Sequence, residues 1–426
     1  MNPQRPGVPP FSVLVVGAGG REHALARAIA QDPQVTAVHV APGNPGTATI
    51  ATNHPVDQLD GAAVAALAVE LGVGLVVVGP EAPLVAGVAD AVRTAGIPCF
   101  GPSAEAARLE GSKSFAKDVM ASAGVPTADA RVCTTADEVA AALDEFGAPY
   151  VVKADGLAAG KGVIVTDDRQ AAVDHAAGCD RVVIEEYLDG EEISLFVITD
   201  GTTCVGLQPA QDFKRVGEGD TGPNTGGMGA YSPLPWAPDD IIEQVLATVA
   251  RPTLDELNLR GIEFSGLLYC GLAMTSRGLR VVEFNARFGD PETQALMGLV
   301  ETPVGQLLLV AATGTLADFG EVHWHPGAAV VVVMAADGYP GTPAKGGAIM
   351  LPPDREDAWV IHAGTALDPD HDQLVAAGGR VLTVVGRGPD LAAARHQAYA
   401  LVDEIDFPTG FVRRDIAARV LAGDPA

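Results

Sequence analysis

The segment Val281–Glu292 reads VVEFNARFGDPE, and the interpretation of the whole chain starts from it. Its apolar start predicts a β-strand, in which successive side chains point to opposite faces. Glu283, Asn285 and Arg287 therefore share one face, and the phenylalanine and alanine between them share the other. Magnesium prefers oxygen ligands and arginine binds phosphate through two N–H groups, so this face suits Mg²⁺ with a nucleotide. An exposed face with an ordinary Glu–Arg pair is the alternative. The turn at Gly289–Glu292, with two further acids, favours the metal-nucleotide site.

Lysine is scarce in this chain, which has six lysines against twenty-one arginines. Five of the six fall in one part of the sequence, at Lys113, Lys117, Lys153, Lys161 and Lys214. Where arginine is the default cation, a retained lysine indicates a need for a compact point charge, as beside nucleotide phosphates. We predict this role for Lys153 and Lys161. Lys117, in contrast, is expected to be a solvated residue on a helix, which arginine can replace without harm.

The composition is that of a globular and acidic protein. Apolar residues make up 48% of the 426 residues, enough for buried cores in roughly two to four domains. The formal charge of −27 argues against nucleic acid or an anionic membrane as a partner. The longest apolar runs, such as 328–336, are too short to span a bilayer. The start, MNPQRPGVPP, lacks the apolar core of a secretion signal, so we expect a flexible leader and a cytoplasmic protein.

The five cysteines point to the same compartment. They are scattered along the chain and form no Cys-x-x-Cys pair: Cys99, Cys133, Cys179, Cys204 and Cys270. An odd number of isolated cysteines favours free thiols in a reducing cytoplasm, without a zinc site and without disulfides.

The N-terminal part alternates between predicted strands and helices. Strands are expected at 11–16, 36–40, 75–78 and 97–100, and helices between them at 20–30, 62–71 and 84–95. This alternation predicts a parallel sheet, and such sheets bind ligands at the carboxyl ends of their strands. Loops rich in glycine and proline follow three of the strands at that edge, at 17–23, 41–47 and 79–83.

The first of these loops, GAGGREH, is not a dinucleotide-binding motif. That motif requires glycine at the position of Glu22, so a nicotinamide or flavin dehydrogenase is disfavoured. A phosphate group at the N-terminus of the helix after Gly20 is compatible with the sequence.

A second glycine-rich segment, ADGLAAGKG, joins two predicted strands at 150–153 and 162–165. It differs from a P-loop because only three residues separate Gly156 from Gly160, and because Gly162 takes the place of serine or threonine after Lys161. We interpret it as a flap between antiparallel strands, whose N–H groups can cover phosphates. A tight structural hairpin is the alternative.

The remaining elements are predicted from periodicity and breaks. The glycine-rich stretch 221–232 is expected to be a loop with too few side chains to pack. Further strands and helices are predicted as follows: helices at 104–123 and 391–405, strands at 181–185 and up to residue 198, and several short strands at 327–388.

Seven motifs are spread over nearly the whole chain: GGREHAL (Gly19–Leu25), APGNPGTA (Ala41–Ala48), VGPEAPLVAG (Val78–Gly87), KADGLAAGKGV (Lys153–Val163), QDFKR (Gln211–Arg215), GDTGPNTGGMGAYSP (Gly219–Pro233) and EFNARFGDPET (Glu283–Thr293). In this order they resemble the glycinamide ribonucleotide synthetase (phosphoribosylamine–glycine ligase) family of the ATP-grasp superfamily. The resemblance implies an α/β multidomain protein. It would have an N-terminal parallel α/β domain (1–106), an ATP-grasp domain (107–322) with a small lid subdomain at about 126–190, and a mixed β/α C-terminal domain (323–426).

The resemblance also implies a nucleotide site. Lys113 and Lys153 would contact the phosphates of ATP, and Glu192 the ribose. The flap over the phosphates and the hinge that holds adenine would be formed by Gly156, Gly160, Lys161 and Gly162, and by Glu185, Glu186, Tyr187 and Leu188, respectively.

The implied metal ligands are Glu283 and Asn285, with Mg²⁺ or Mn²⁺, and Arg287 would contact the transferring phosphoryl group. Many enzymes of this superfamily use another acid on the preceding strand. Residues 266–274 contain none, so a second metal ion held entirely by the protein is not expected.

The implied reaction is the ATP-dependent ligation of glycine to 5-phosphoribosylamine through a glycyl phosphate, the second step of purine biosynthesis. Arg287, Asp212 and Lys214 are the catalytic candidates. Asp212 would hold the ammonium group of glycine, and a plain ion pair with Lys214 or Arg215 is the alternative. The candidate substrate contacts are Gly19, Gly20, Arg21, Glu22, Asn44, Gly46, Glu81, Arg215, Asn224 and Asp290.

Two other functions are compatible with parts of this pattern. A different carboxylate–amine ligase or carboxylase of the superfamily would share the nucleotide site, but the 211–215 and 219–233 motifs argue against it. A nucleotide-binding regulator without activity would not need to retain Lys153 together with Glu283, Asn285 and Arg287. We further expect a monomer that acts on small molecules.

Overall fold

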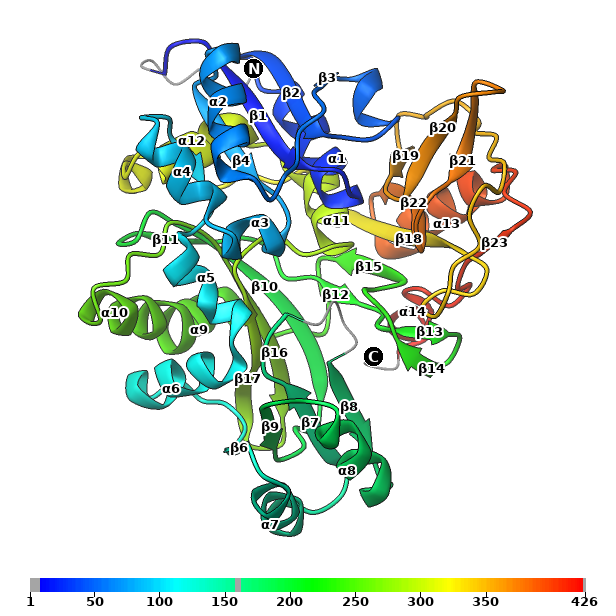
Figure 1. The fold of residues 1–426 in the computed structure, drawn as a ribbon. Coiled ribbons are helices and arrows are strands. Elements are labelled where there is room, and N and C mark those ends of the chain that lie inside the picture. Colours follow the sequence, from blue (N-terminus) through cyan, green and yellow to red (C-terminus); the bar gives the residue numbers. More distant parts are fainter. Residues whose placement is uncertain (1–7, 158–161, 424–426) are drawn as a thin grey trace.

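The computed structural model describes residues 8–157 and 162–423. Figure 1 shows an N-terminal sheet at the top, a small sheet at the bottom and the C-terminal strands at the right, with a central antiparallel sheet between them. The α/β multidomain fold predicted from the sequence is confirmed. The first seven residues of the expected leader, and flap residues 158–161, lie outside the described residues.

The N-terminal sheet is parallel throughout, in the order β3-β2-β1-β4-β5. Its strands are β1 (Phe11–Gly17), β2 (Val35–Pro42), β3 (Thr52–Asn53), β4 (Leu75–Val78) and β5 (Cys99–Phe100). The first connecting helices are α1 (Gly20–Ala30) and α2 (Gly61–Leu71). The parallel sheet and its four predicted strands are therefore confirmed, and the two-residue β3 is an addition too short for sequence periodicity to reveal.

Two predicted helices are each broken into two. The 84–95 helix is α3 (Glu81–Val85) and α4 (Val88–Thr94), because Gly87 between them adopts a left-handed conformation with φ 85°. The 104–123 helix is α5 (Ala104–Gly111) and α6 (Lys113–Ala123). Ser112 is extended here, and its side chain accepts a hydrogen bond from the backbone N–H of Phe115, which caps α6.

The central sheet is antiparallel, in the order β11-β10-β16-β17. Its strands are β10 (Glu191–Thr199), β11 (Cys204–Gly206), β16 (Gly266–Thr275) and β17 (Gly278–Asn285). Outside it lies one continuous helical stretch made of α9 (Ile241–Val245), a π-helical turn at Leu246–Ala250 and α10 (Arg251–Leu259). The α10 end of this stretch packs against α6.

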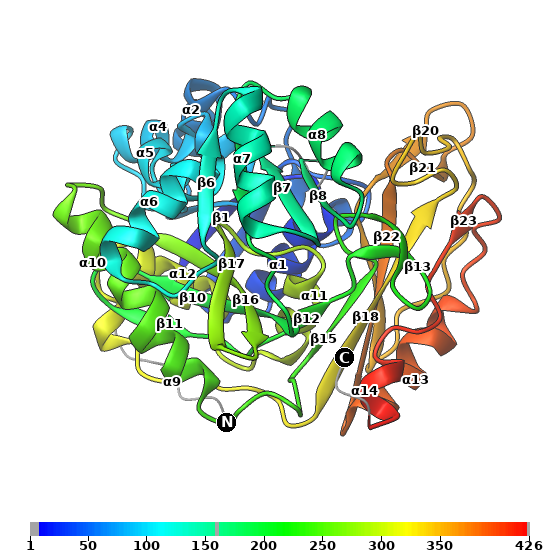
Figure 2. The same ribbon diagram turned by 90° about the horizontal axis from the view of Figure 1, so that it is seen from below.

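A second antiparallel sheet, called here the small sheet, has the order β6-β9-β7-β8. Its strands are β6 (Ala130–Cys133), β7 (Tyr150–Ala154), β8 (Val163–Thr166) and β9 (Val182–Glu185). Helices α7 (Ala136–Phe146) and α8 (Arg169–Ala177) pack on it, as Figure 2 shows from below. A separate cluster of buried apolar side chains, including Leu143, Val152 and Ile184, gives the small sheet its own core.

The C-terminal strands form a six-stranded sheet in the order β12-β15-β18-β22-β19, with β23 also paired to β18. The strands are β12 (Gln211–Asp212), β15 (Gly229–Ser232), β18 (Ala328–Ala336), β19 (Ala358–His362), β22 (Arg380–Gly388) and β23 (Gly410–Phe411). Helix α13 (Leu391–Val402) covers β22 and β18, and the short α14 (Ala418–Leu421) follows it. Two hairpins complete this part, β13 (Arg215–Gly217) with β14 (Thr221–Asn224) and β20 (Thr365–Asp368) with β21 (Gln373–Ala376).

The prediction that 221–232 is an unpacked loop was wrong. Its first half is β14, and its second half is β15, which is buried between β12 and β18. The glycines permit this packing, because a Cβ added at Gly229 would come within 2.6 Å of the carbonyl oxygen of Val331. Tyr231 supplies the one large buried side chain of the strand. A glycine-rich strand can thus be held by backbone pairing where side chains have no room.

Two further helices connect the sheets. α11 (Glu292–Leu299) begins at the last residue of the Gly289–Glu292 turn and packs against α1 and β18, which links the N-terminal and C-terminal sheets. α12 (Val304–Ala312) packs against α1 and β5. Across residues 8–157 and 162–423, no helix combines the length and the apolar character needed to cross a membrane.

Candidate active site

Two cavities lie where the sheets meet. The first, of about 390 Å³, is lined by α5 and α6, the small sheet and the end of β17, and it is called here the central cleft. The second, of about 410 Å³, lies between the loops after β1 and β2 and the C-terminal strands, and it is called here the loop cavity. Asp290, Tyr339 and Arg380 line both cavities. The two cavities are therefore neighbours that share one wall.

Lys153, on β7, is buried at one end of the central cleft. Its Nζ lies 2.8 Å from Oε2 of Glu185 and donates a hydrogen bond of 2.9 Å to the carbonyl oxygen of Val282. Burial disfavours the charged form of Lys153, but Glu185 and Glu283 outweigh this effect and raise its pKa. Lys113, at the start of α6, reaches the same region, where its Nζ donates to the carbonyl oxygen of Gly156 at 3.1 Å. Two positive charges therefore stand at this end of the cleft.

The expectation that Lys117 is a solvated helix residue was wrong. Its side chain is only 11% exposed, and its Nζ lies 3.2 Å from Oε1 of Glu185. Burial lowers the pKa of Lys117, and Glu185 offsets part of this effect. The error arose because helix position alone does not show that β9 brings a carboxylate to this face of α6.

The predicted hinge follows β9. Glu185 is buried between the two lysines, whereas Glu186 lies outside the cleft, with Oε2 2.8 Å from Nη2 of Arg277. The backbone N–H of Glu186 donates to the carbonyl oxygen of Asp129 at 3.0 Å, and the side chain of Tyr187 is about half exposed. Of these hinge residues, Glu185 alone lines the central cleft.

The strand β17 shows the alternation predicted from its sequence. Glu283 and Asn285 line the central cleft, whereas Phe284 and Ala286 pack into the main apolar core, with Phe284 also bordering the cleft. Glu283 faces Gly271 of β16, whose missing side chain leaves room beside the carboxylate. In the described parts of the chain, no group of three or more His, Cys, Asp or Glu is arranged to hold a metal ion. The carboxylate and amide oxygens of this pair fit Mg²⁺ when nucleotide phosphates and water complete its coordination.

Arg287 is held by acids from two other elements. Its Nη2 lies 2.8 Å from Oε1 of Glu110 on α5 and 3.3 Å from Oδ1 of Asn285, and its Nε lies 3.4 Å from Oε2 of Glu81. Burial raises the pKa of Glu110, against the pull of Arg287. For Glu81 burial acts in the same direction, but Arg287 and Arg21 outweigh it and lower the pKa. The guanidinium is thus fixed in position beside the predicted metal ligands.

Asp212 and Lys214 form a partly exposed ion pair in the cleft, with the carboxylate more deeply placed than the ammonium group. The Nζ of Lys214 lies 2.6 Å from Oδ1 of Asp212 and 2.7 Å from Oε2 of Glu192. Burial raises the pKa of Asp212 to about 6, although Lys214 acts in the opposite direction. Lys214 holds the pKa of Glu192 below its ordinary value. The ion pair that the sequence suggested as an alternative role for Asp212 is therefore present, within the lining of the cleft.

A buried polar network lies beside this pair. The hydroxyls of Ser194 and Tyr269 are 2.7 Å apart, and the hydroxyl of Tyr269 donates to Oε1 of Glu292 at 3.0 Å. Burial and Glu292 raise the pKa of Tyr269 far above its ordinary value, so this hydroxyl keeps its proton. Glu292 stands at the start of α11, where the positive end of the helix favours a carboxylate.

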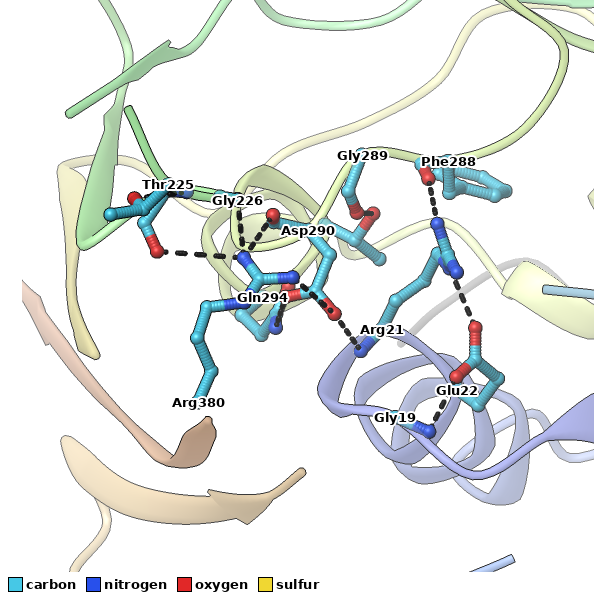
Figure 3. Close-up of polar contacts among 12 residues, drawn as sticks. Gly19, Arg21, Glu22, Thr225, Gly226, Phe288, Gly289, Asp290, Gln294 and Arg380 are labelled. Carbon is cyan, nitrogen blue, oxygen red and sulfur yellow. Dashed lines mark hydrogen bonds and ion pairs between the residues drawn. The ribbon is translucent and has the colours of Figure 1, made fainter. Parts of the chain in front are cut away.

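Arg380, on β22, joins the C-terminal sheet to the wall between the two cavities (Figure 3). Its Nη1 donates to the carbonyl oxygens of Gly226 and Asp290, and its Nη2 lies 3.5 Å from Oδ2 of Asp290. The same carboxyl oxygen accepts a long hydrogen bond of 3.4 Å from the backbone N–H of Arg21. Burial opposes the charged form of Asp290, but Arg380 and Arg21 keep its pKa below the ordinary value. One carboxylate thus ties α1, the turn after β17 and β22 together.

The loops after β1 and β2 are held by their own side chains and by the C-terminal sheet. The side-chain nitrogen of Asn44 donates to the carbonyl oxygens of Ala18 and His362, at 2.9 and 3.1 Å. Gly46 lies against the rings of His23 and His362, where an added Cβ would come within 2.4–2.5 Å. Burial lowers the pKa of His23 to about 3 and that of His362 to about 4, so both rings are neutral at pH 7. The two histidines form an uncharged contact between the N-terminal and C-terminal sheets.

The predicted site residues fall into three groups. Those that line the central cleft are Arg21, Glu81, Lys113, Lys153, Gly156, Gly162, Glu185, Asp212, Lys214, Glu283, Asn285, Arg287 and Asp290. Those that line the loop cavity are Gly19, Gly20 and Asn44, together with Asp290. Those that line neither are Glu22, Gly46, Glu186, Tyr187, Leu188, Glu192, Arg215 and Asn224. Gly160 and Lys161 lie outside the described residues.

Two of the residues that line neither cavity serve the local structure. Glu22 is buried beneath the first loop, where Oε2 accepts from the backbone N–H of Gly19 at 2.6 Å and Oε1 lies 2.6 Å from Nε of Arg21. Arg215 faces Asn224 across the β13–β14 hairpin and donates to the carbonyl oxygen of Gly222 at 2.9 Å.

Sequence reasoning missed several charged or hydroxyl-bearing lining residues. Among them are Glu110, Lys117, Tyr269, Glu292, Tyr339 and Arg380, and Thr225 of the quoted 219–233 motif also lines the cleft. For Glu292 a signal existed, since it ends the quoted 281–292 segment. Glu110 and Lys117 lie on helices, Tyr269 and Arg380 on strands and Tyr339 in a turn, all without a local motif, and only the folded chain brings them to the cleft.

A cleft between an antiparallel sheet and a smaller sheet that carries a buried lysine is the architecture of the ATP-grasp class of enzymes. The chain belongs to the phosphoribosylglycinamide synthetase family within that class. Models of this family match its three parts: the N domain at residues 11–110, the ATP-grasp (A) domain at 111–293 and the C domain at 329–419.

Individual relatives are similar over nearly their full length. A phosphoribosylamine–glycine ligase of Streptomyces coelicolor is 62% identical over 414 residues, which is 96% of this chain and 99% of the relative. The enzyme of the same name from Mycobacterium tuberculosis is 56% identical over 420 residues, with the same coverage. The crystal structure of the Thermotoga maritima phosphoribosylamine–glycine ligase superimposes with a TM-score of 0.83 at 35% identity, covering 95% of this chain and all of the other. A biotin carboxylase from Campylobacter jejuni shares only the fold, at 16% identity and a TM-score of 0.71.

Proposed function

We propose that this protein uses ATP to join glycine to 5-phosphoribosylamine, and that it produces glycinamide ribonucleotide, ADP and phosphate in purine biosynthesis. The observation that carries the proposal is the 62% identity, over 96% of the chain, to a relative named phosphoribosylamine–glycine ligase. The structure adds a cleft with lysines at one end, a carboxylate–amide pair beside them and a second cavity across a shared wall. Such an arrangement provides separate places for a nucleotide and for a second, phosphate-bearing substrate.

The proposed division of the chain is that expected from its sequence. An N-terminal domain (1–106) and a C-terminal domain (323–426) flank an ATP-grasp domain (107–322), with a lid subdomain at about 126–190. The separate core of the small sheet supports the lid. β12 and β15 belong to the ATP-grasp stretch by sequence but pair with the C-terminal sheet, so the contact between these two domains is extensive.

The nucleotide is proposed to bind at the lysine end of the central cleft. Lys113 and Lys153 would contact its phosphates, with Gly156, Gly160, Lys161 and Gly162 in the flap. The hinge 185–188 would hold adenine, and Glu192 the ribose. The charge of Lys153, stabilised by two carboxylates, supports the phosphate assignment because a protonated ammonium group is required there.

Glu283 and Asn285 are the proposed ligands of a Mg²⁺ or Mn²⁺ ion that is bound together with the nucleotide. Such an ion would neutralise the phosphate oxygens and orient the γ-phosphate. Arg287, which Glu110 and Glu81 hold in place, would face the transferring phosphoryl group. Because its guanidinium is already fixed, little reorganisation is needed as negative charge develops.

The chemistry is proposed to have two steps. In the first, a carboxylate oxygen of glycine attacks the γ-phosphorus of ATP; the bond to the β,γ-bridging oxygen breaks, and ADP leaves. In the second, the amine of 5-phosphoribosylamine attacks the carbonyl carbon of the glycyl phosphate; the C–O bond to phosphate breaks, and the nitrogen loses a proton. Asp212 would hold the ammonium group of glycine, and Lys214 would neutralise charge on the phosphoryl oxygens. Exclusion of water is essential because an acyl phosphate hydrolyses readily.

The amine substrate is proposed to enter through the loop cavity. Gly19, Gly20 and Asn44 line it on the N-terminal side, and Asp290 stands in the wall that it shares with the central cleft. Arg21 and Glu81 reach the cleft side of this wall. Of the other candidates, Glu22 and Gly46 shape the two loops, and Arg215 and Asn224 belong to the hairpin near the cleft. These four are proposed to act through the shape of the site.

The setting of the reaction is also part of the proposal. We propose a cytoplasmic monomer that acts on small molecules, without nucleic acid or membrane partners. The formal charge of −27 supports the absence of nucleic acid and membrane partners, and the five free cysteines support the cytoplasmic setting.

The proposed function is tested by measuring ADP release in a coupled assay from which each substrate is omitted in turn. Release is expected only when ATP, glycine, 5-phosphoribosylamine and a divalent ion are all present. A panel of other amines and carboxylates tests the alternative ligases and carboxylases. ADP release that does not depend on glycine, or no release with the full set, would refute the proposal.

A further inference from the structure

Lys117 makes three short contacts from α6, and none of them is explained by packing alone. Its Nζ lies 2.9 Å from Oγ1 of Thr127, 2.9 Å from the carbonyl oxygen of Ala128 and 3.2 Å from Oε1 of Glu185. An ammonium group has three hydrogens to donate, and here it meets three acceptors. Each of the three N–H groups of Lys117 can therefore donate to its own acceptor.

The three acceptors belong to the two places where the chain passes between the small sheet and the rest of the protein. Thr127 and Ala128 precede β6, where the chain enters the small sheet, and Glu185 ends β9, where it leaves. Lys117 itself lies outside the small sheet. The Lys117 side chain thus attaches both of these connecting segments to α6.

The entering segment is also attached to β17. The backbone N–H of Val281 donates to the carbonyl oxygen of Pro126 at 2.8 Å, and Oγ1 of Thr127 donates to the carbonyl oxygen of Val281 at 2.6 Å. Thr127 therefore links Lys117 to the strand that carries Glu283. A shift of the Lys117 ammonium group would therefore displace residues on both sides of the cleft.

Glu185 extends this chain of contacts to the second lysine. While Oε1 faces Lys117, Oε2 lies 2.8 Å from Nζ of Lys153. Both oxygens of the carboxylate are thus occupied, and their direction depends on both lysines. Without Lys117 the carboxylate is free to rotate, and Lys153 loses the fixed partner that orients it beside Val282.

We propose that Lys117 is a positioning residue for the nucleotide: it orients Glu185 and Lys153, and it sets the small sheet at the angle that ATP binding requires. The inference rests on the proposed use of the central cleft for ATP. It also predicts that arginine cannot replace Lys117, because a planar guanidinium with five donors does not match three converging acceptors.

The test compares Lys117→Met and Lys117→Arg with Lys345→Met, which removes an exposed lysine that lines neither cavity. Affinity for a nonhydrolysable ATP analogue is measured by calorimetry, and KM for ATP and for glycine by steady-state kinetics. Both Lys117 variants are expected to bind the analogue about tenfold more weakly, because Met loses the charge-assisted contacts and Arg cannot meet the three acceptors together. KM for glycine at saturating ATP should stay near the wild-type value, and Lys345→Met should match the wild type throughout.

Melting temperatures separate positioning from stability. A purely structural role would lower the melting temperature of both variants without changing analogue affinity, and that result would overturn the inference. An equal rise in KM for ATP and for glycine would also overturn it. If the Lys117 variants do not fold, Thr127→Val removes one of the three acceptors, and unchanged analogue affinity in this variant would be equally decisive. Failure of the wild-type protein to bind the analogue would refute the proposed function and this inference together, whereas normal binding by the Lys117 variants refutes the inference alone.

Discussion

The proposed nucleotide end and the proposed amine end of the active-site region are built in different ways. At the nucleotide end, Lys153, Glu185 and Glu283 stand on strands β7, β9 and β17, and their side chains converge on one another directly. At the amine end, Arg380 on β22 reaches Asp290, which is 90 residues earlier in the chain, through a loop carbonyl and a carboxylate. The first end is made by strand geometry, and the second by loops that meet across three sheets.

Because of this difference, we expect substitutions at the two ends to have different effects. On a strand, the direction of a side chain follows from its place in the alternation, and the neighbouring strands fix it further. In a loop, the direction of a side chain depends on distant partners, such as the contact between Asn44 and the carbonyl oxygen of His362, 318 residues apart. We therefore expect changes at the nucleotide end to affect ATP binding or the chemistry itself, and changes at the amine end to affect the binding of 5-phosphoribosylamine.

The largest effect is expected for Glu283→Gln, which changes the charge of a proposed metal ligand and little else. Turnover should fall by about a thousandfold, because a metal ion contributes several kcal/mol to transition-state stabilisation. The melting temperature should stay unchanged, since the side chain is partly exposed in the cleft. ADP release measured over a range of Mg²⁺ concentrations checks this expectation, and near-normal turnover at low Mg²⁺ would remove Glu283 from the metal site.

A smaller and more selective effect is expected for Arg380→Met. The change removes the hydrogen bonds to Gly226 and Asp290 and leaves the carboxylate of Asp290 with a weaker set of partners. The KM for 5-phosphoribosylamine should rise by about a hundredfold, because truncating one member of a largely desolvated charge pair leaves the other without its partner. Affinity for an ATP analogue should be unaffected.

Arg387→Met is the matched control for this variant. Arg387 lies on the same strand but pairs with the exposed carboxylate of Asp357. Arg387→Met should change neither the KM for 5-phosphoribosylamine nor the affinity for the ATP analogue. An Arg380 variant that loses ATP affinity as much as amine affinity would contradict the separation of the two ends.

The smallest effect is expected in the pH dependence of activity, and it concerns Asp212, which lies between the two ends. Burial raises the pKa of Asp212 to about 6, and the proposed contact with the ammonium group of glycine requires its ionised form. The value of kcat/KM for glycine should therefore fall as the pH drops through about 6, approaching tenfold for each further unit. In Lys214→Met the cation that lowers this pKa is lost, so the same limb should move to higher pH. A profile that stays flat down to about pH 5 would exclude this role for Asp212.

The nucleotide end was the more predictable of the two from sequence. The period of two in 281–287 placed Glu283 and Asn285 on one face, and the structure puts both in the cleft with Phe284 in the core. The strand–flap–strand interpretation of 150–165 was likewise correct in its two strands, β7 and β8, which pair antiparallel. Both inferences use only local periodicity, which survives folding when a strand has one buried face.

The errors and omissions arose where distant residues decide the outcome. Lys117 has an ordinary helical position, and only β9 turns it into a buried partner of Glu185. Glu110 lies in an alanine-rich helix with no motif, yet it accepts from the backbone N–H of Ala286 at 2.7 Å and holds Arg287. The 221–232 stretch had too few side chains to suggest a strand, but backbone pairing between β12 and β18 needs none. Arg380 has no sequence signal at all.

The central claim is that one cleft carries ATP-driven activation of glycine, followed by transfer to an amine. The most direct test uses glycine labelled with ¹⁸O in both carboxylate oxygens. If glycine's carboxylate attacks the γ-phosphate and the amine then displaces phosphate, one ¹⁸O must appear in each phosphate released and one must remain in the amide carbonyl. Mass spectrometry of the phosphate and of the amide product measures both. Release of phosphate that carries no ¹⁸O would contradict the account.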